Sequence, residues 1–133
     1  MIKKILLAGA FALSLSACHH DTLDDRAEQI TQDYTRRYCP TPVQDMQRTD
    51  SLTFTRVTHT FNFYYTLTDK ADNAGVIAKQ KGKIVKELLR QLKDNTSYKV
   101  FKEAGFNFHY VFRSSSTKAV LIESTFGQKQ YKE

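Results

Sequence analysis

The chain has 133 residues, of which 41% are hydrophobic and 26% are charged, and its formal net charge is +6. This composition is that of one ordinary globular domain and excludes a collagen-like, low-complexity or disordered chain. The mild basic excess favours acidic headgroups, polysaccharide or an acidic protein as partners, and it is too small to indicate a nucleic-acid-binding protein.

The first 17 residues predict a secretory signal peptide. Lys3 and Lys4 form a short basic region, and no charged residue follows them before Asp21. The apolar run between them is too short to cross a membrane, which takes roughly 20 apolar residues. We therefore expect residues 1–17 to be removed, residues 18–24 to form a polar tether, and residues 25–133 to form a single domain.

The apolar run ends in the sequence Leu15, Ser16, Ala17 and Cys18. These four residues resemble the lipobox of bacterial lipoprotein precursors, Leu-[Ala/Ser]-[Gly/Ala]-Cys. The resemblance implies that a signal peptidase recognises residues 15–17 and cleaves before Cys18, whose thiol carries a diacylglyceryl group. Two or three acyl chains make a stable anchor. His19 replaces the Asp that often retains lipoproteins in the inner membrane of enteric bacteria, so we expect an outer-membrane protein facing the periplasm or the cell surface.

Hydrophobic periodicity in the rest of the chain predicts the element order α-β-β-α-β-β. The clearest strand has Phe61, Phe63, Tyr65 and Leu67 on one side and polar residues on the other. A short helical turn is expected near residues 97–104, and the tail from Gly127 is expected to fray. The expected helices are 25–38 and 76–92, and the expected strands are 51–58, 60–68, 106–113 and 118–126.

The connections within the two pairs of strands are short, which indicates two antiparallel hairpins. We therefore expect an α+β fold, with one four-stranded antiparallel sheet and both helices packed on its aromatic face. The other face would carry Asn62, Tyr64, His109 and Arg113. Exposed Tyr and Arg side chains suit recognition, so these four residues form the candidate binding face.

The body of the chain also resembles small lipoproteins of Bacteroidota-type bacteria. In those proteins, as here at Cys39-Pro40, a helix ends in a Cys-Pro-like element. An aromatic strand follows, here residues 63–67, and then a Lys-rich helix, here residues 79–93. The resemblance brings no catalytic residues with it. The Lys-rich helix would lie on anionic headgroups or, as we prefer, present an ordinary solvated face.

No catalytic or cofactor motif is found, so we expect no enzyme activity and no cofactor. His19, His20 and Asp21 lie in a flexible tether and offer no fixed geometry for a metal. Cys39 remains as the one free thiol after lipidation. Burial is favoured for Cys39 over an intermolecular disulfide or a catalytic pairing with His59 or His109.

These observations predict a membrane-anchored lipoprotein of the cell envelope whose domain binds a protein, peptide or glycan. Two alternatives stay open: a structural accessory subunit of an outer-membrane assembly, and a small inhibitor or immunity protein, the latter by analogy of fold alone. The sequence leaves the oligomeric state open.

Overall fold

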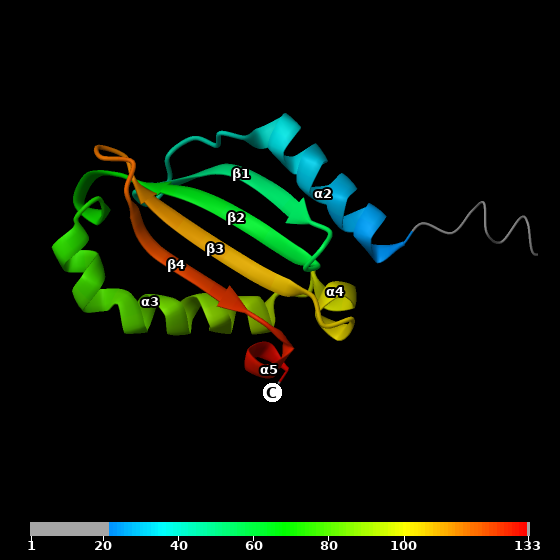
Figure 1. Ribbon diagram of the computed structural model, residues 1–133. Helices are drawn as coiled ribbons and strands as arrows, with labels where there is room; N and C mark the ends of the chain where they lie inside the picture. The colour runs from blue at the N-terminus through cyan, green and yellow to red at the C-terminus, as the bar shows by residue number, and fades with distance from the viewer. Residues whose placement is uncertain (1–21, 133) are drawn as a thin grey trace, which may run out of the picture.

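The computed structural model describes residues 22–132, which form one four-stranded sheet with helices on one of its faces (Figure 1). The expected signal peptide, the lipobox with Cys18 and the His19-His20-Asp21 sequence lie outside the described residues.

The first described helix, α2 (Leu23–Tyr38), begins with a capping box. The Thr22 hydroxyl accepts a hydrogen bond from the backbone N–H of Asp25 at 3.1 Å, and the Asp25 carboxylate accepts one from the Thr22 N–H. The helix ends at Tyr38, with Cys39 as its C-cap residue immediately before Pro40, as the sequence predicts. It begins two residues earlier than predicted, because Thr22 is the N-cap residue. The expected tether is shortened accordingly.

The sheet has the spatial order β1-β2-β3-β4, and its two outer pairs are the antiparallel hairpins that we expect. A register shift between Thr49 and Ser51 bulges β1, and another bulges the β3–β4 pair. The strands are β1 (Gln47–Thr55), β2 (Thr60–Leu67), β3 (Asn107–Ser114) and β4 (Val120–Phe126).

The prediction of a wholly antiparallel sheet is wrong, because β2 and β3 are parallel. The chain between them forms a short 3₁₀ turn, η1 (Asp69–Ala71), then α3 (Ala74–Asp94) and α4 (Lys99–Glu103). This helical crossover returns the chain to the end of the sheet where β2 begins, so β3 must start there and run in the same direction. The α+β class and the four strands are confirmed, but the sheet is mixed.

The core is built from aromatic rings that the parallel pairing places side by side. Stacked pairs join the two central strands: Phe61 with Phe108 at 5.4 Å, Phe63 with Tyr110 at 4.8 Å, and Tyr65 with Phe112 at 4.7 Å between ring centroids. Phe101 of α4 packs edge-on against Phe61 at 4.9 Å. The aromatic face therefore meets the helices, as the alternation predicts.

The helices lie towards the two edges of this face. In Figure 1, α2 runs beside β1 and α3 runs beneath the opposite edge at β4. The C-terminal tail is also a helix, α5 (Gln128–Tyr131), and the prediction that it frays is wrong. Tyr131 is buried, and its hydroxyl donates a 2.7 Å hydrogen bond to the Phe106 carbonyl. One aromatic residue is enough to dock this short tail.

Candidate binding groove

The long helix α3 has buried side chains only near its two ends. Ile77 and Leu92 are buried, whereas the apolar residues between them are half-exposed. An amphipathic helix normally buries its apolar stripe against the core. Here the residues in the middle of α3 pack only partly against the core, and a cavity of about 420 Å³ lies between this helix and the sheet. The half-exposed residues are Ile84, Val85, Leu88 and Leu89.

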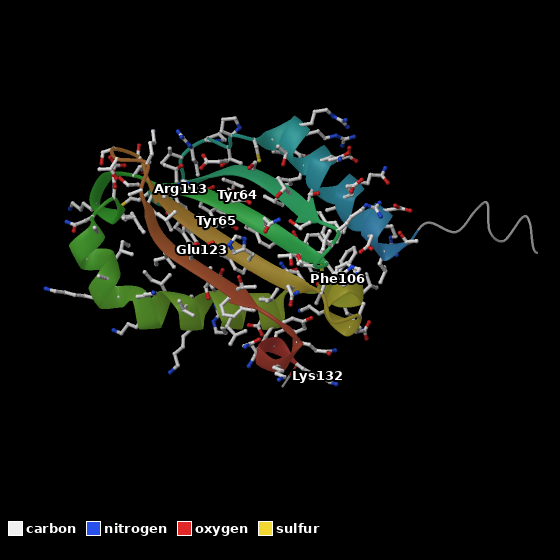
Figure 2. The ribbon with its side chains drawn as sticks, viewed as in Figure 1. Tyr64, Tyr65, Phe106, Arg113, Glu123 and Lys132 are labelled. Carbon is white, nitrogen blue, oxygen red and sulfur yellow. The ribbon has the colours of Figure 1, made fainter. Side chains whose placement is uncertain are left out.

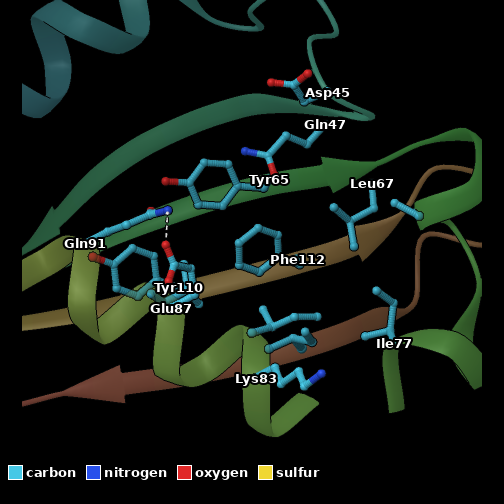
Figure 3. Close-up of a pocket in the computed structure, with 14 residues that line it drawn as sticks. Asp45, Gln47, Tyr65, Leu67, Ile77, Lys83, Glu87, Gln91, Tyr110 and Phe112 are labelled. Atoms are coloured by element: carbon cyan, nitrogen blue, oxygen red, sulfur yellow. Dashed lines mark hydrogen bonds between the residues drawn. The ribbon is translucent and has the colours of Figure 1, made fainter. Parts of the chain in front are cut away.

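Figure 3 shows the apolar floor and polar rim of this cavity. The floor comes from the sheet, where Tyr65 and Phe112 lie side by side, and one wall comes from Ile84 and Leu88 of α3. At the rim, the Gln91 amide donates a hydrogen bond to the Glu87 carboxylate. The floor is completed by Leu67, Tyr110 and Ile122, and the rim by Asp45, Gln47 and Lys83.

A second cavity of about 260 Å³ continues from the first towards α2. The two cavities share three lining residues, namely Tyr65, Tyr110 and Gln91. Ile30 and Tyr34 of α2 form the far wall of the second cavity. We call the two cavities together the α2–α3 groove. It crosses the aromatic face of the sheet between the two helices.

Two tyrosine hydroxyls give this apolar groove its polar character. Burial raises the pKa of both Tyr65 and Tyr110 above the ordinary phenol value, and neighbouring tyrosines add to the effect. Tyr110 is only 8% exposed, and within residues 22–132 neither hydroxyl makes a hydrogen bond. Within the same residues no buried side-chain polar atom lacks a hydrogen-bond partner, so both hydroxyls remain accessible to solvent in the groove. A ligand with apolar groups and one or two hydrogen-bonding atoms would complement the groove.

The candidate face predicted from the sequence lies on the opposite side of the sheet. Asn62 donates to Thr53 and Thr55 hydroxyls at 3.1 and 3.0 Å, and its carbonyl oxygen lies 2.8 Å from His109 Nδ1. His109 Nε2 lies 2.6 Å from a Glu123 carboxylate oxygen. These contacts run across all four strands. The polar side-chain atoms of Asn62 and His109 are therefore paired with neighbouring residues of the sheet.

The other two predicted residues lie beside this chain. Tyr64 packs edge-on against the His109 ring with centroids 6.4 Å apart, so Asn62, Tyr64 and His109 are brought together. Arg113 is exposed and donates to the Lys118 carbonyl at the β3–β4 turn. Figure 2 labels Tyr64, Arg113 and Glu123 on β2, β3 and β4. Asn62, Tyr64, His109 and Arg113 do not line the α2–α3 groove.

Sequence reasoning assigned the groove residues to the core and did not recognise them as a site. The row Lys83, Glu87 and Gln91, spaced four residues apart beside the apolar stripe, could have indicated a solvent-facing rim. Nothing in the sequence indicated that the middle of α3 would cover the aromatic face only in part.

Cys39 is a free, half-buried thiol, and burial raises its pKa, with the nearby Asp50 carboxylate adding to the effect. His59 lies 2.7 Å from Asp24, and His109 is held by Asn62 and Glu123, so neither histidine pairs with this thiol. Within residues 22–132, no group of three or more His, Cys, Asp or Glu side chains is arranged to hold a metal. In the same part of the chain, no helix is long and apolar enough to cross a membrane.

Residues 22–122 match the family model described as "Domain of unknown function (DUF8479)", and the chain therefore belongs to this family. No curated protein sequence matches the chain.

Three solved structures share the fold. A protein of Pseudomonas aeruginosa described as secreted (PA3611) has a TM-score of 0.64 at 11% identity, covering 84% of this chain and 97% of its own. The type II secretion pilotin EpsS of Vibrio vulnificus has a TM-score of 0.62 at 8% identity, covering 81% and 90%. The pilotin AspS of Vibrio cholerae has a TM-score of 0.60 at 11% identity, covering 81% and 91%. At these identities the likeness is one of fold.

Proposed function

We propose that this protein is a lipid-anchored accessory subunit of an outer-membrane assembly, and that it holds an apolar segment of a partner protein in the α2–α3 groove. The observation that carries the proposal is the groove itself, an apolar cleft between two helices over an aromatic floor. The likeness in fold to two type II secretion pilotins supports the accessory role over a general binding module.

The groove favours a segment that presents apolar side chains along one side. Such a segment would cover the half-exposed Ile84 and Leu88, gaining the free energy of removing apolar surface from water. Its polar backbone or side-chain atoms would pair with the Tyr65 and Tyr110 hydroxyls and would meet Gln91 at the rim. Amphipathic helices commonly bind in grooves of this type.

The proposal is tested by site-specific photocrosslinking in intact cell envelopes. A photoreactive residue at Gln91, which lines both cavities, is compared with one at the exposed Glu123 on the opposite sheet face. We expect Gln91 to crosslink to one outer-membrane protein and Glu123 to give none of that product. Crosslinking to that protein from Glu123 instead would contradict the groove and favour the open sheet face with Asn62 and His109.

The anchor is tested separately, by the mass of the protein purified from membranes. We expect a chain that begins at Cys18 and carries acyl chains, and we expect the Cys18→Ala variant to lack them. Protease treatment of whole cells would then distinguish a domain on the cell surface, which is cleaved, from one in the periplasm, which is protected. An unmodified chain beginning at another residue would refute the lipid anchor and leave the groove as a separate question.

A further inference from the structure

The outer side of α3 carries a regular row of cations. Lys79, Lys83, Lys86, Arg90 and Lys93 follow one another at spacings of 4, 3, 4 and 3 residues. This spacing places all five on one side of an α-helix, along about 21 Å of its axis. We call these five residues the basic stripe. Figure 2 shows nitrogen-tipped side chains extending from α3 away from the sheet.

The basic stripe has little internal neutralisation. All five residues are exposed. Arg90 pairs with Glu87 and with Asp94, but within residues 22–132 none of the four lysines forms an ion pair. Solvated cations of this kind are free to approach an external anionic surface.

Positive charge is concentrated on this side of the molecule. Helix α3 has six basic and two acidic residues, whereas α2 has three basic and four acidic residues. A cleft of about 330 Å³ between α4 and α5 adjoins α3 and adds Lys99 and Lys132. The uneven distribution gives the domain one cationic side, and the α2 side is close to neutral.

Most of the basic stripe faces away from the groove, and only Lys83, at the edge of the stripe, also lines the groove's rim. At 100° per residue, Lys86 lies about 160° around the helix from both Ile84 and Leu88, which line the groove. Lys79 and Lys93, each seven residues from Lys86, share its side of the helix. An anionic surface on the stripe would therefore leave the groove open to a partner.

We propose that the basic stripe docks the domain onto an anionic lipid surface, with α3 lying along the headgroups. A row of flexible lysines without a shaped cleft matches a plane of phosphates, and lysine acts there as a point charge. The apolar stripe of α3 faces the sheet, so contact is with headgroups and does not need insertion into the acyl region.

The start of α2, which follows the expected anchor, and the end of α3 lie at the same end of the sheet (Figure 1). Asp24 in the first turn of α2 contacts His59, whose ring lies 5.2 Å from that of Phe106, beside Phe101 of α4. Helix α3 also ends there, since the Lys102 ammonium of α4 donates to the Leu92 carbonyl. A lipid on Cys18, four residues before Thr22 and at most about 14 Å away, would hold this end at the membrane. The docking itself does not require that lipid.

The test is sedimentation of the mature chain, residues 18–133 with Cys18→Ala, with phosphatidylcholine vesicles, with and without phosphatidylglycerol. The triple variant Lys79→Gln, Lys86→Gln, Lys93→Gln is compared with Arg26→Gln, Arg36→Gln, Arg37→Gln on α2, which removes the same charge. At about fivefold per lysine, the α3 variant should lose about a hundredfold of its affinity for anionic vesicles. The α2 variant should keep its affinity within a few-fold. Thermal melts of both variants verify folding.

Two results would overturn the proposal. One is an equal loss of affinity in the two triple variants, which would show attraction by net charge alone. The other is parent-protein binding that does not depend on phosphatidylglycerol, which would leave an acidic protein as the partner of the stripe. The groove proposal is judged by crosslinking at Gln91, and the anchor proposal by mass, so each of the three can fail without the others.

Discussion

Thr35 makes a contact that its place in a helix does not suggest. Its hydroxyl donates to the Leu52 carbonyl at 2.8 Å and accepts from the Leu52 backbone N–H at 2.9 Å. One side chain thus takes the place of a neighbouring strand at the free edge of β1. An unpaired strand edge invites pairing with other chains, and this contact both protects the edge and fixes α2 against it.

Thr35→Val should destabilise the protein by about 1–3 kcal/mol, because the Leu52 backbone groups lose their partner in a partly buried site. The matched control is Thr31→Val in the same helix. The Thr31 hydroxyl bonds only to the Ala27 and Glu28 carbonyls of its own helix, so its loss should cost less. Urea unfolding of the two variants measures the difference. Equal losses would show that the Leu52 contact is unimportant.

Asp72 joins the start of the crossover to the β3–β4 turn. Its carboxylate accepts from the Ser114 hydroxyl at 2.5 Å and from the Ser116 N–H at 3.0 Å. These bonds favour the charged form and hold the pKa of Asp72 below its usual 3.8. A lowered folded-state pKa stabilises the fold above the unfolded value, and this stabilisation is lost as the pH falls through the folded pKa.

We therefore expect Asp72→Asn to be less stable than the parent protein at neutral pH. The gap should narrow as the pH falls below 3.8, where the parent carboxyl becomes protonated. Thermal unfolding of both proteins across this range measures it. A gap that stays constant with pH would mean that the Asp72 charge does not contribute.

At the scale of elements, the short C-terminal helix α5 is held against the domain mainly by one side chain. Helix α5 has four residues, and Tyr131 supplies its buried contact. The Tyr131 ring packs edge-on against Phe108 at 5.7 Å. The Tyr131 side chain is held by residues of α4 and of the start of β3, which are distant from it in sequence. For this reason the polar sequence of the tail does not predict that the tail packs against the domain.

Tyr131→Ala should cost about 3–5 kcal/mol of unfolding free energy, as for other large buried aromatic residues. The control is Tyr38→Ala at the end of α2, where the side chain is 58% exposed and a much smaller loss is expected. Chemical denaturation of both variants provides the measurement. A small effect at Tyr131 would restore the expectation of a fraying tail.

The helix α3 shows the same dependence on distant parts of the chain. Its apolar stripe is plain from the sequence and is correctly expected to face the aromatic side of the sheet. How closely it approaches the sheet depends on the parallel pairing of β2 and β3, and on the helix packing near β4 rather than over the centre.

At the scale of the whole molecule, the groove exists because two helices cover two edges of one face and leave its centre to side chains alone. Tyr65 and Tyr110 then serve both as core residues and as the floor of a site. The cationic side lies on the far side of α3, so the arrangement would separate the proposed partner-binding groove from the proposed membrane-facing stripe.

If the middle of α3 borders real free volume, enlarging a side chain there should be tolerated. Leu88→Phe should change stability by less than about 1 kcal/mol and should reduce crosslinking at Gln91 by filling the groove. Ala27→Leu, in the fully buried contact of α2 with the sheet, should cost about 1–3 kcal/mol through overpacking. A large loss of stability at Leu88 would indicate that α3 packs tightly and that the groove is closed.

The sequence by itself determined the two long helices, the four strands in outline, the two hairpins and the aromatic face, because these follow from local periodicity and from residues such as Pro40. The first strand lies earlier than predicted, at Gln47–Thr55 instead of 51–58, because its entry carries little hydrophobic periodicity. The lipobox prediction also comes from sequence alone and lies outside the described residues. Only the tertiary structure decided the parallel pairing of β2 with β3, the docking of Tyr131 and the opening of the groove. These features depend on contacts between segments far apart in the chain, and local sequence patterns do not predict how closely two such segments pack.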